Sequence, residues 1–543
     1  MNARLNSAFD VIVVGGGTNG LVAAAALGKA GRRVLLLERG EGTGGQSRAG
    51  EFAPGFRAPA SGIDAGWVPP SVARGLGLPA LPIVAPSVAV AVAEPDGNFL
   101  SLASDPVRAA EAIRTRSPRD AERWGPFTTR LRKLAGFLSA LYELPPPDID
   151  TSAFGEIAPL LGLGRKFRAL GKADMTELLR VLPMPVQDLL DDWFESPSLK
   201  AAVAAGGIRD IRQGPRSGGT SFVLLHYMVG APAASVRARP WWRDGPETFS
   251  SAVEAVARAS GVTVRTNATV ARIIVREDVV AGVVLAEGEE IAAPVVISTA
   301  DPARTLLHLV DPVWLDPELL EAVRHIKFRG CTAMVQYALD ALPEVAGLSR
   351  DALAGVVSLT PTMDGLERAY DAAKYGELSA APHIEVTVPT LRWPSLAPAG
   401  KHVLVARVQY APYLLRDGAC WDAARADALA QRADDVIGRS MPAVSSMVLH
   451  RAVVTPRDLA ERFALTEGAL THGELTLDQI LFMRPVAGLG RHAMPIAGLY
   501  LGGAGAHPGP GVLGGPGWLA AQRVLADGKR SNGRRSKKTN GGS

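Results

Sequence analysis

A strand, a glycine-rich turn, a helix and a second strand follow one another near the start of this chain. Residues 11–14 are apolar, as expected for one buried strand of a parallel sheet, and residues 34–37 repeat that pattern. The alanine-rich stretch 21–30 between them predicts a helix. This unit constrains the fold more than any other feature, because parallel strands joined by a helix belong to an α/β sheet covered on both faces.

The turn between the first strand and the helix carries Gly15, Gly17 and Gly20, spaced as in a dinucleotide site. Gly15 permits the tight turn, Gly17 lets the backbone approach a pyrophosphate, and Gly20 lets helix and strand pack closely. Thr18 and Asn19 lie where the helix begins, and free N–H groups at a helix N-terminus attract phosphate. A lone glycine motif is common, but the complete strand–turn–helix–strand unit predicts a bound dinucleotide.

Glu38 closes the second strand and is placed to accept hydrogen bonds from a ribose diol. Its carboxylate would repel a 2′-phosphate, which disfavours NADP. Arg39 comes next, followed by a glycine-rich loop whose backbone can pass close to a ligand. The predicted ligand residues of that loop are Gly44, Gly45, Gln46 and Arg48. Arg48 either reaches a phosphate or flavin edge or is a solvated arginine in a flexible turn.

The length and charge of the chain indicate its broad class. At 543 residues it exceeds what one core usually holds, so two lobes are expected. Its formal charge is +4, but residues 528–543 carry six lysines and arginines and no acid, which leaves 4 − 6 = −2 for the rest. A near-neutral body gives no reason to expect nucleic acid as a partner. The basic tail 528–543 is expected to be disordered, with a contact to anionic lipid as the alternative.

Cysteine usage and hydropathy favour a cytoplasmic protein. Cys331 and Cys420 are far apart, which argues against a disulfide framework, a cysteine-rich metal site and a redox-active dithiol. The first strand begins too early to leave room for a secretory signal. No stretch reaches the roughly 18 uninterrupted apolar residues of a membrane span. Residues 162–170 mix bulky apolar and basic side chains, so they predict either a half-buried helix or a peripheral contact with a membrane surface.

Two later segments are expected to return to the dinucleotide site. Residues 262–285 and 291–292 have the pattern of a small antiparallel meander, and residues 295–298 that of one buried strand. Near the C-terminus, the apolar residues 499–501 precede a glycine-dense turn and a last helix, so backbone N–H groups can point at a ligand. His507 in that turn either contacts the flavin or substrate or caps backbone groups.

These segments together resemble the phytoene desaturase and carotenoid oxidoreductase superfamily of FAD enzymes. The resemblance rests on the opening nucleotide motif and on residues 42–48, 52–56, 117–124, 297–306, 475–485 and 499–517. Within the superfamily the chain is most similar to the carotenoid-ketolase-type branch, which includes the pyridine nucleotide-disulfide oxidoreductase domain-containing 2 proteins. The resemblance implies bound FAD. It implies that His507 is a catalytic residue. It also implies six further cofactor residues, which are Val270, Gly503, Ala504, Gly505, Gly511 and Val512.

The same resemblance implies an α/β fold of two lobes, a Rossmann-type FAD-binding domain and a mixed α+β substrate domain with a helical subdomain. The chain is expected to alternate between them. The FAD-binding domain takes residues 1–80, 241–310 and 471–527, and the substrate domain takes residues 81–240, with helices over 121–200, and residues 311–470.

The predicted activity is removal of hydride from carbon of an apolar small molecule, with carotenoids and other isoprenoids implied by the resemblance. Residues 488–493 fit the looser glycine fingerprint, but no strand–helix–strand unit with a following acid surrounds them. The substrate is therefore expected to reduce the FAD, and oxygen or a quinone to reoxidise it. Two alternatives stay open. One is an amine oxidase with Trp67, Trp241, Trp242 or Tyr500 facing the flavin, and the other is a flavin-binding interaction protein without turnover.

Overall fold

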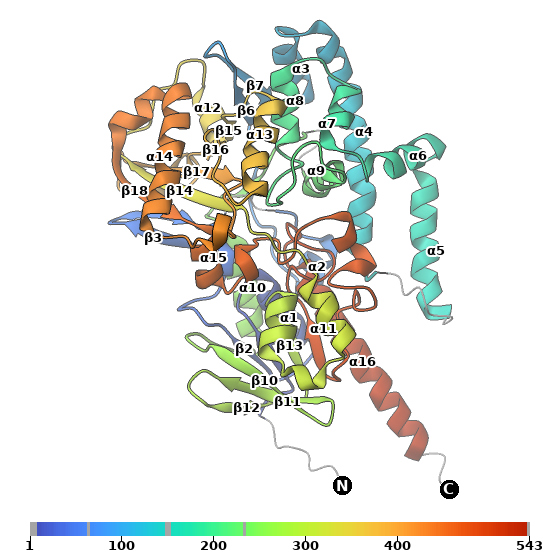
Figure 1. Ribbon diagram of the computed structural model, residues 1–543. Helices are drawn as coiled ribbons and strands as arrows, with labels where there is room; N and C mark the ends of the chain where they lie inside the picture. The colour runs from blue at the N-terminus through green and yellow to red at the C-terminus, as the bar shows by residue number, and fades with distance from the viewer. Residues whose placement is uncertain (1–7, 62–65, 147–153, 232–234, 540–543) are drawn as a thin grey trace.

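The computed structural model describes residues 8–61, 66–146, 154–231 and 235–539, and it shows an α/β chain in two lobes (Figure 1). One lobe is built on a five-stranded parallel sheet in the order β19-β13-β1-β2-β9. Its strands come from distant parts of the chain: β1 (Val11–Val14), β2 (Val34–Leu37), β9 (Thr263–Arg265), β13 (Val296–Ser298) and β19 (Leu499–Leu501). The first two strands have the predicted bounds.

Helices cover this parallel sheet because its central strands are buried on both faces. Helix α1 (Thr18–Lys29) follows β1 and packs between α10 (Thr248–Ala259) and α16 (Gly515–Thr539). Alanines 23 to 26 of α1 are all buried, which lets these neighbours approach closely. The buried face of β1 and β2 toward α1 forms one apolar cluster with residues of α10 and α16.

The predicted meander differs in one strand. Residues 263–265 were expected in it, but β9 instead pairs in parallel with β2 at the edge of the five-stranded sheet. The antiparallel sheet consists of β10 (Val270–Arg276), β11 (Val279–Leu285) and β12 (Glu290–Ala292). An alternating apolar pattern predicts a strand but does not identify the strand's partner, and here Thr263 pairs with the distant Leu35.

The second lobe is built on a seven-stranded mixed sheet, called the substrate sheet below, in the order β18-β14-β17-β16-β15-β6-β7. Its strands are β6 (Val88–Ala93), β7 (Phe99–Ala103), β14 (Thr332–Leu339), β15 (Val356–Ser358), β16 (His383–Thr387), β17 (His402–Gln409) and β18 (Val448–Val454). Strand β6 pairs in parallel with β15, so residues from 81–240 and 311–470 share one sheet. Helices α12 (Arg350–Ala354), α13 (Met363–Lys374), α14 (Ala423–Ser440) and α15 (Pro456–Phe463) lie around it, and α11 (Pro317–Arg324) belongs to the first lobe.

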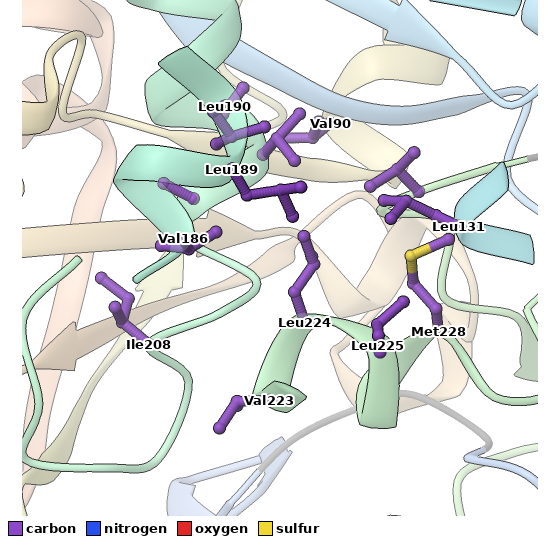
Figure 2. Packing of buried hydrophobic residues seen from close by; sticks show 14 of the residues in the cluster. Val90, Leu131, Val186, Leu189, Leu190, Ile208, Val223, Leu224, Leu225 and Met228 are labelled. Carbon is purple, nitrogen blue, oxygen red and sulfur yellow. The ribbon is translucent and has the colours of Figure 1, made fainter. Parts of the chain in front are cut away.

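A helical region joins the two lobes. It contains α3 (Pro106–Arg114), α4 (Pro118–Tyr142), α5 (Phe154–Ala169), α6 (Lys172–Val181), α7 (Val186–Asp191), α8 (Pro197–Ala204) and α9 (Thr220–Met228). Figure 2 shows the core of this region, where apolar side chains of α4, α7 and α9 meet Val90 of β6. This cluster fixes α9 between the substrate sheet and the helices, and α9 borders the cavity described below.

Helix α5 stands away from the body of the molecule (Figure 1). In its described half, Leu163 and Phe167 are half-buried, and the Phe167 ring lies 5.4 Å from that of Phe137 in α4. The neighbouring basic side chains are exposed. Among the described residues, no helix has the length and apolar character needed to cross a membrane.

The disordered tail expected over 528–543 overlaps the last helix of the structure. Helix α16 continues to Thr539, and residues 540–543 lie outside the described part of the chain. A helix that is already nucleated on the sheet extends at little cost, since each added residue gains one hydrogen bond for the dihedrals it fixes. The remaining short elements are α2 (Pro70–Leu76) and the strand pairs β3 (Ala49–Ala53) with β4 (Phe56–Pro59) and β5 (Ile83–Val84) with β8 (Trp241–Trp242).

Candidate cofactor and active site

A cavity of about 380 Å³ lies at the carboxyl ends of β1, β2 and β13. In open α/β sheets this edge is where ligands bind, and the volume lies within the range of small-molecule and cofactor sites. Its wall combines the turn after β1, the loop after β2, the start of β10, the residues after β13 and the turn after β19. Residues from the two ends of the chain therefore face one space.

Thirteen of the seventeen predicted cofactor residues line this cavity. They are Gly15, Gly17, Thr18, Asn19, Glu38, Arg39, Gly44, Gly45, Gln46, Val270, Ala504, Gly511 and Val512. The other four, together with His507, are not part of its lining. These are Gly20, Arg48, Gly503 and Gly505.

The turn after β1 has the features that a diphosphate requires. Helix α1 begins after Gly17 without a side-chain cap and without an acidic residue in its first turn, so its first N–H groups are available to an anion. Gly15 adopts φ of 100°, and a Cβ at Gly45 would lie 3.1 Å from the Cα of Gly17. The two glycine turns thus touch through backbone alone. The buried Oδ1 of Asn19 has no hydrogen-bond partner among the described residues.

Glu38 lies beside this turn with its carboxylate anchored at both oxygens. Oε2 accepts a hydrogen bond from the N–H of Gly16, and Oε1 accepts one from the N–H of Gly40, each at 2.7 Å. A carboxylate has about four acceptor positions, so these two bonds leave capacity for ribose hydroxyls. The anchoring also fixes the direction of the side chain where it borders the cavity.

The glycines outside the lining allow close packing instead of ligand contact. A Cβ at Gly20 would lie 1.9 Å from the carbonyl oxygen of Gly15. Similarly, a Cβ at Gly503 would lie 2.3 Å from the Thr299 carbonyl oxygen. Arg48 donates to the Gly42 carbonyl oxygen at 3.3 Å, so its guanidinium contacts its own loop. These residues shape the site without facing it.

His507 is buried behind the C-terminal turn, where its Nε2 donates to the carbonyl oxygen of Leu144 at 3.0 Å. Burial lowers the pKa of His507 to about 3, so its imidazole is neutral. This position corresponds to the backbone-capping alternative, and the predicted catalytic role receives no support from it. The local glycine-rich sequence placed the residue near the site but could not indicate the direction of its ring.

Arg484 anchors the turn after β19 through its side chain. It is fully buried, and its guanidinium donates to four carbonyl oxygens, including that of cavity-lining Ala504 at 2.8 Å. The other three acceptors are the carbonyl oxygens of Thr471, Gly473 and Gln479. Burial lowers the pKa of Arg484 to about 10. The turn is therefore anchored by a side chain that the site prediction did not include.

The cavity wall also contains charged and aromatic residues that no local sequence pattern singles out. Tyr227 of α9 contacts two arginines through its ring, with the Arg239 and Arg209 guanidinium carbons 4.8 and 5.6 Å from the ring centre. Asp210 forms an ion pair with Arg407, whose Nη1 donates to the Ser61 carbonyl oxygen at 2.9 Å. Further lining side chains are Asp301, Arg304, Arg462, Phe463 and His472.

The aromatic residues proposed for an amine pocket are not gathered at this cavity. Trp241 and Trp242 pack in apolar clusters, and the Tyr500 hydroxyl donates to Asp527 at 3.1 Å. Trp67 borders a separate small cavity next to Tyr227. Among the described residues, no group of three or more His, Cys, Asp or Glu is arranged to hold a metal ion. The donor set instead suits a dinucleotide: an uncapped helix N-terminus, glycine backbones and an anchored carboxylate.

Comparison with known proteins agrees with this geometry. Residues 13–64 match the NAD(P)-binding Rossmann-like domain, and residues 101–525 match the flavin containing amine oxidoreductase family. The rat pyridine nucleotide-disulfide oxidoreductase domain-containing protein 2 is 31% identical over 551 residues, which covers 97% of this chain and 95% of the relative.

More distant relatives carry names of defined reactions. A limonene dehydrogenase component from Castellaniella defragrans is 25% identical, covering 95% of this chain and 94% of that relative. The neurosporene-forming phytoene desaturase of Cereibacter sphaeroides is 26% identical, covering 56% of this chain and 53% of that relative. Among solved structures, a triple mutant of putrescine oxidase aligns with a TM-score of 0.59 at 15% identity, covering 96% of this chain and 99% of that one. This last likeness shows the fold alone.

Proposed function

The chain belongs to the flavin containing amine oxidoreductase family, within the phytoene desaturase-like superfamily, and we propose that it uses FAD to remove hydride from carbon of an apolar small molecule. The observation that carries the proposal is the single cavity formed jointly by the turns after β1 and β19. A cofactor that spans both turns would have its diphosphate held at the N-terminus of α1, and residues of α9 would border its other end. FAD supplies the hydride acceptor when bound.

The chain's own residues would then bind and orient that cofactor. Gly15, Gly17 and the N-terminus of α1 hold the diphosphate, Glu38 accepts from the ribose, and the turn 509–512 borders the remaining part. We propose oxygen or a quinone as the acceptor that reoxidises the flavin. The names of two relatives, a limonene dehydrogenase and a phytoene desaturase, support an isoprenoid as the substrate class.

The cofactor proposal is tested by the absorption spectrum of the purified protein. We expect flavin bands near those of bound FAD, and release of FAD rather than FMN on denaturation. A colourless protein that FAD does not reconstitute would overturn both the cofactor and the enzyme proposal.

The substrate proposal is tested by anaerobic reduction of the flavin. We expect a lipid extract to bleach the flavin bands, a panel of primary amines to leave them unchanged, and oxygen or a soluble quinone to restore them. Bleaching by amines alone would replace the apolar substrate by an amine. If no metabolite fraction bleaches a flavin that dithionite does reduce, the protein binds FAD without turnover.

A further inference from the structure

The turn after β19 contains two glycines on either side of Pro510, and both have left-handed backbone conformations. Gly509 has φ of 107° and Gly511 has φ of 73°. Glycine populates several backbone conformations with similar ease, so such a turn needs contacts from outside to hold one of them. Backbone hydrogen bonds between Trp67 and residues 511 and 513 fix one side of the turn. They leave the carbonyl group of Pro510 to be held by another partner.

That partner is His226 of α9. Its Nε2 lies 2.7 Å from the Pro510 carbonyl oxygen, and its Nδ1 lies 2.7 Å from the hydroxyl oxygen of Tyr142, the last residue of α4. His226 and Tyr142 are 3% and 4% exposed, so these bonds are shielded from bulk water. Three groups from distant parts of the chain therefore form one buried line.

The chemistry of these groups allows only one arrangement of protons. A carbonyl oxygen can only accept, so Nε2 of His226 carries the proton and donates it to Pro510. In the neutral imidazole Nδ1 is then an acceptor, and the Tyr142 hydroxyl must donate to it. Burial lowers the pKa of His226 to about 4, which keeps this form at neutral pH. A side chain lacking either function would leave a buried polar group without a partner.

We infer that His226 is a positioning residue for the cofactor, because it fixes the Gly509–Val512 turn from the rigid helices α4 and α9. The inference rests on the proposed FAD site. Pro510, Gly511 and Val512 line the cavity, and the next residue after His226, Tyr227, lines it as well. The histidine itself does not line the cavity, so its effect passes through the turn. The packed core in Figure 2, which contains Val223, Leu224 and Leu225, holds α9 in place on one side.

Glutamine offers a sharp test, because its amide presents one acceptor and one donor group as the neutral imidazole does. We expect His226→Leu to weaken FAD binding by about tenfold or more, as a buried carbonyl and a buried hydroxyl lose their partner. We expect His226→Gln to restore most of the affinity and the wild-type flavin spectrum. Tyr142→Phe removes only the outer bond, so its effect should be smaller, and it should add little to His226→Leu if both act through one line.

The measurement is titration of the apoprotein with FAD, followed by flavin fluorescence quenching, with the visible spectrum and melting temperature recorded for each variant. His383→Leu is the matched control. His383 is also buried and bonds a hydroxyl, that of Thr360 at 3.0 Å, but it lies in the substrate sheet away from the cavity wall. We expect the His383→Leu variant to have a lower melting temperature than the wild type and an unchanged affinity for FAD.

The outcomes separate the two proposals. If the wild-type protein binds no FAD, the proposed function fails and this inference fails with it. If the wild type binds FAD and His226→Leu binds it equally well with the same spectrum, only the inference is overturned. The same holds if His383→Leu loses as much affinity as His226→Leu, or if His226→Gln is no better than His226→Leu. If His226→Leu does not fold, the FAD affinity of Tyr142→Phe is compared with that of the wild type, since this substitution removes only one hydroxyl from the core. Equal affinities would then overturn the inference.

Discussion

Replacing Gly20 by alanine tests the close approach between α1 and the turn after β1. The new Cβ would lie 1.9 Å from the carbonyl oxygen of Gly15, a backbone atom that no side-chain rotation can move. Alanine is favoured over glycine in a helix by about 1 kcal/mol, whereas overpacking of this kind costs about 3 kcal/mol. The expected net loss is about 2 kcal/mol, which corresponds to roughly 4 to 8 °C in melting temperature for a cooperative unit of about 200 residues.

The matched substitution is Gly136→Ala in α4, another glycine within a helix. A Cβ there meets nothing within 4 Å, so only the helix propensity acts and a gain of up to about 1 kcal/mol is expected. Thermal unfolding monitored by circular dichroism gives the melting temperatures, and FAD titration gives the second reading. Because the Gly15 peptide must shift in Gly20→Ala, its FAD affinity should also fall by about tenfold. Equal melting temperatures and affinities for Gly20→Ala and wild type would refute the described packing.

Three further predictions concern charges and buried groups. Glu38→Gln should weaken FAD binding about tenfold or more in the same titration, because an amide cannot accept from both Gly16 and Gly40, while Glu41→Gln on the exposed loop should have no effect. Arg484→Met should lower stability by about 3 kcal/mol or more in thermal unfolding, since four buried carbonyl oxygens lose their donor; an unchanged melting temperature would contradict the described anchoring. Stability should fall as the pH drops from about 6.5 toward 4, because burial lowers the pKa of several histidines and the unfolded chain then binds protons that the folded chain does not. Each of these histidines lowers the free energy of unfolding by up to about 1.4 kcal/mol per pH unit. A melting temperature that does not change with pH over this range would contradict the prediction. These histidines are His226, His383, His492 and His507.

The parts of the site that the sequence predicted are those where local pattern and chemistry coincide. Gly15, Gly17 and Glu38 lie in a strand–turn–helix–strand unit whose geometry follows from short-range periodicity, and the structure places all three at the cavity. The turn after β19 was found because a short strand, many glycines and a helix follow one another. In each case the ligand-facing group is backbone or lies directly next to a strand end.

Residues that depend on packing between distant segments were not predicted. Tyr227 faces the cavity because α9 is fixed between the substrate sheet and the helical core, and no local pattern reports that orientation. His507 lies in the glycine-rich turn that the sequence indicated, and its ring donates to the carbonyl oxygen of Leu144, as in the backbone-capping alternative. One signal was present for His226: a single histidine within the apolar helix α9 must find hydrogen-bond partners for both ring nitrogens when it is buried.

The order of strands in the five-stranded sheet has a consequence for biosynthesis. β1 is made long before its neighbour β13, and β19 is made last of the five strands. A nascent chain that still lacks β19 would expose one side of β13 and offer the nucleotide only part of its wall. We therefore expect FAD to enter only after β19 has been made, and a premature stop before β19 to yield a polypeptide that chaperones retain or proteases remove.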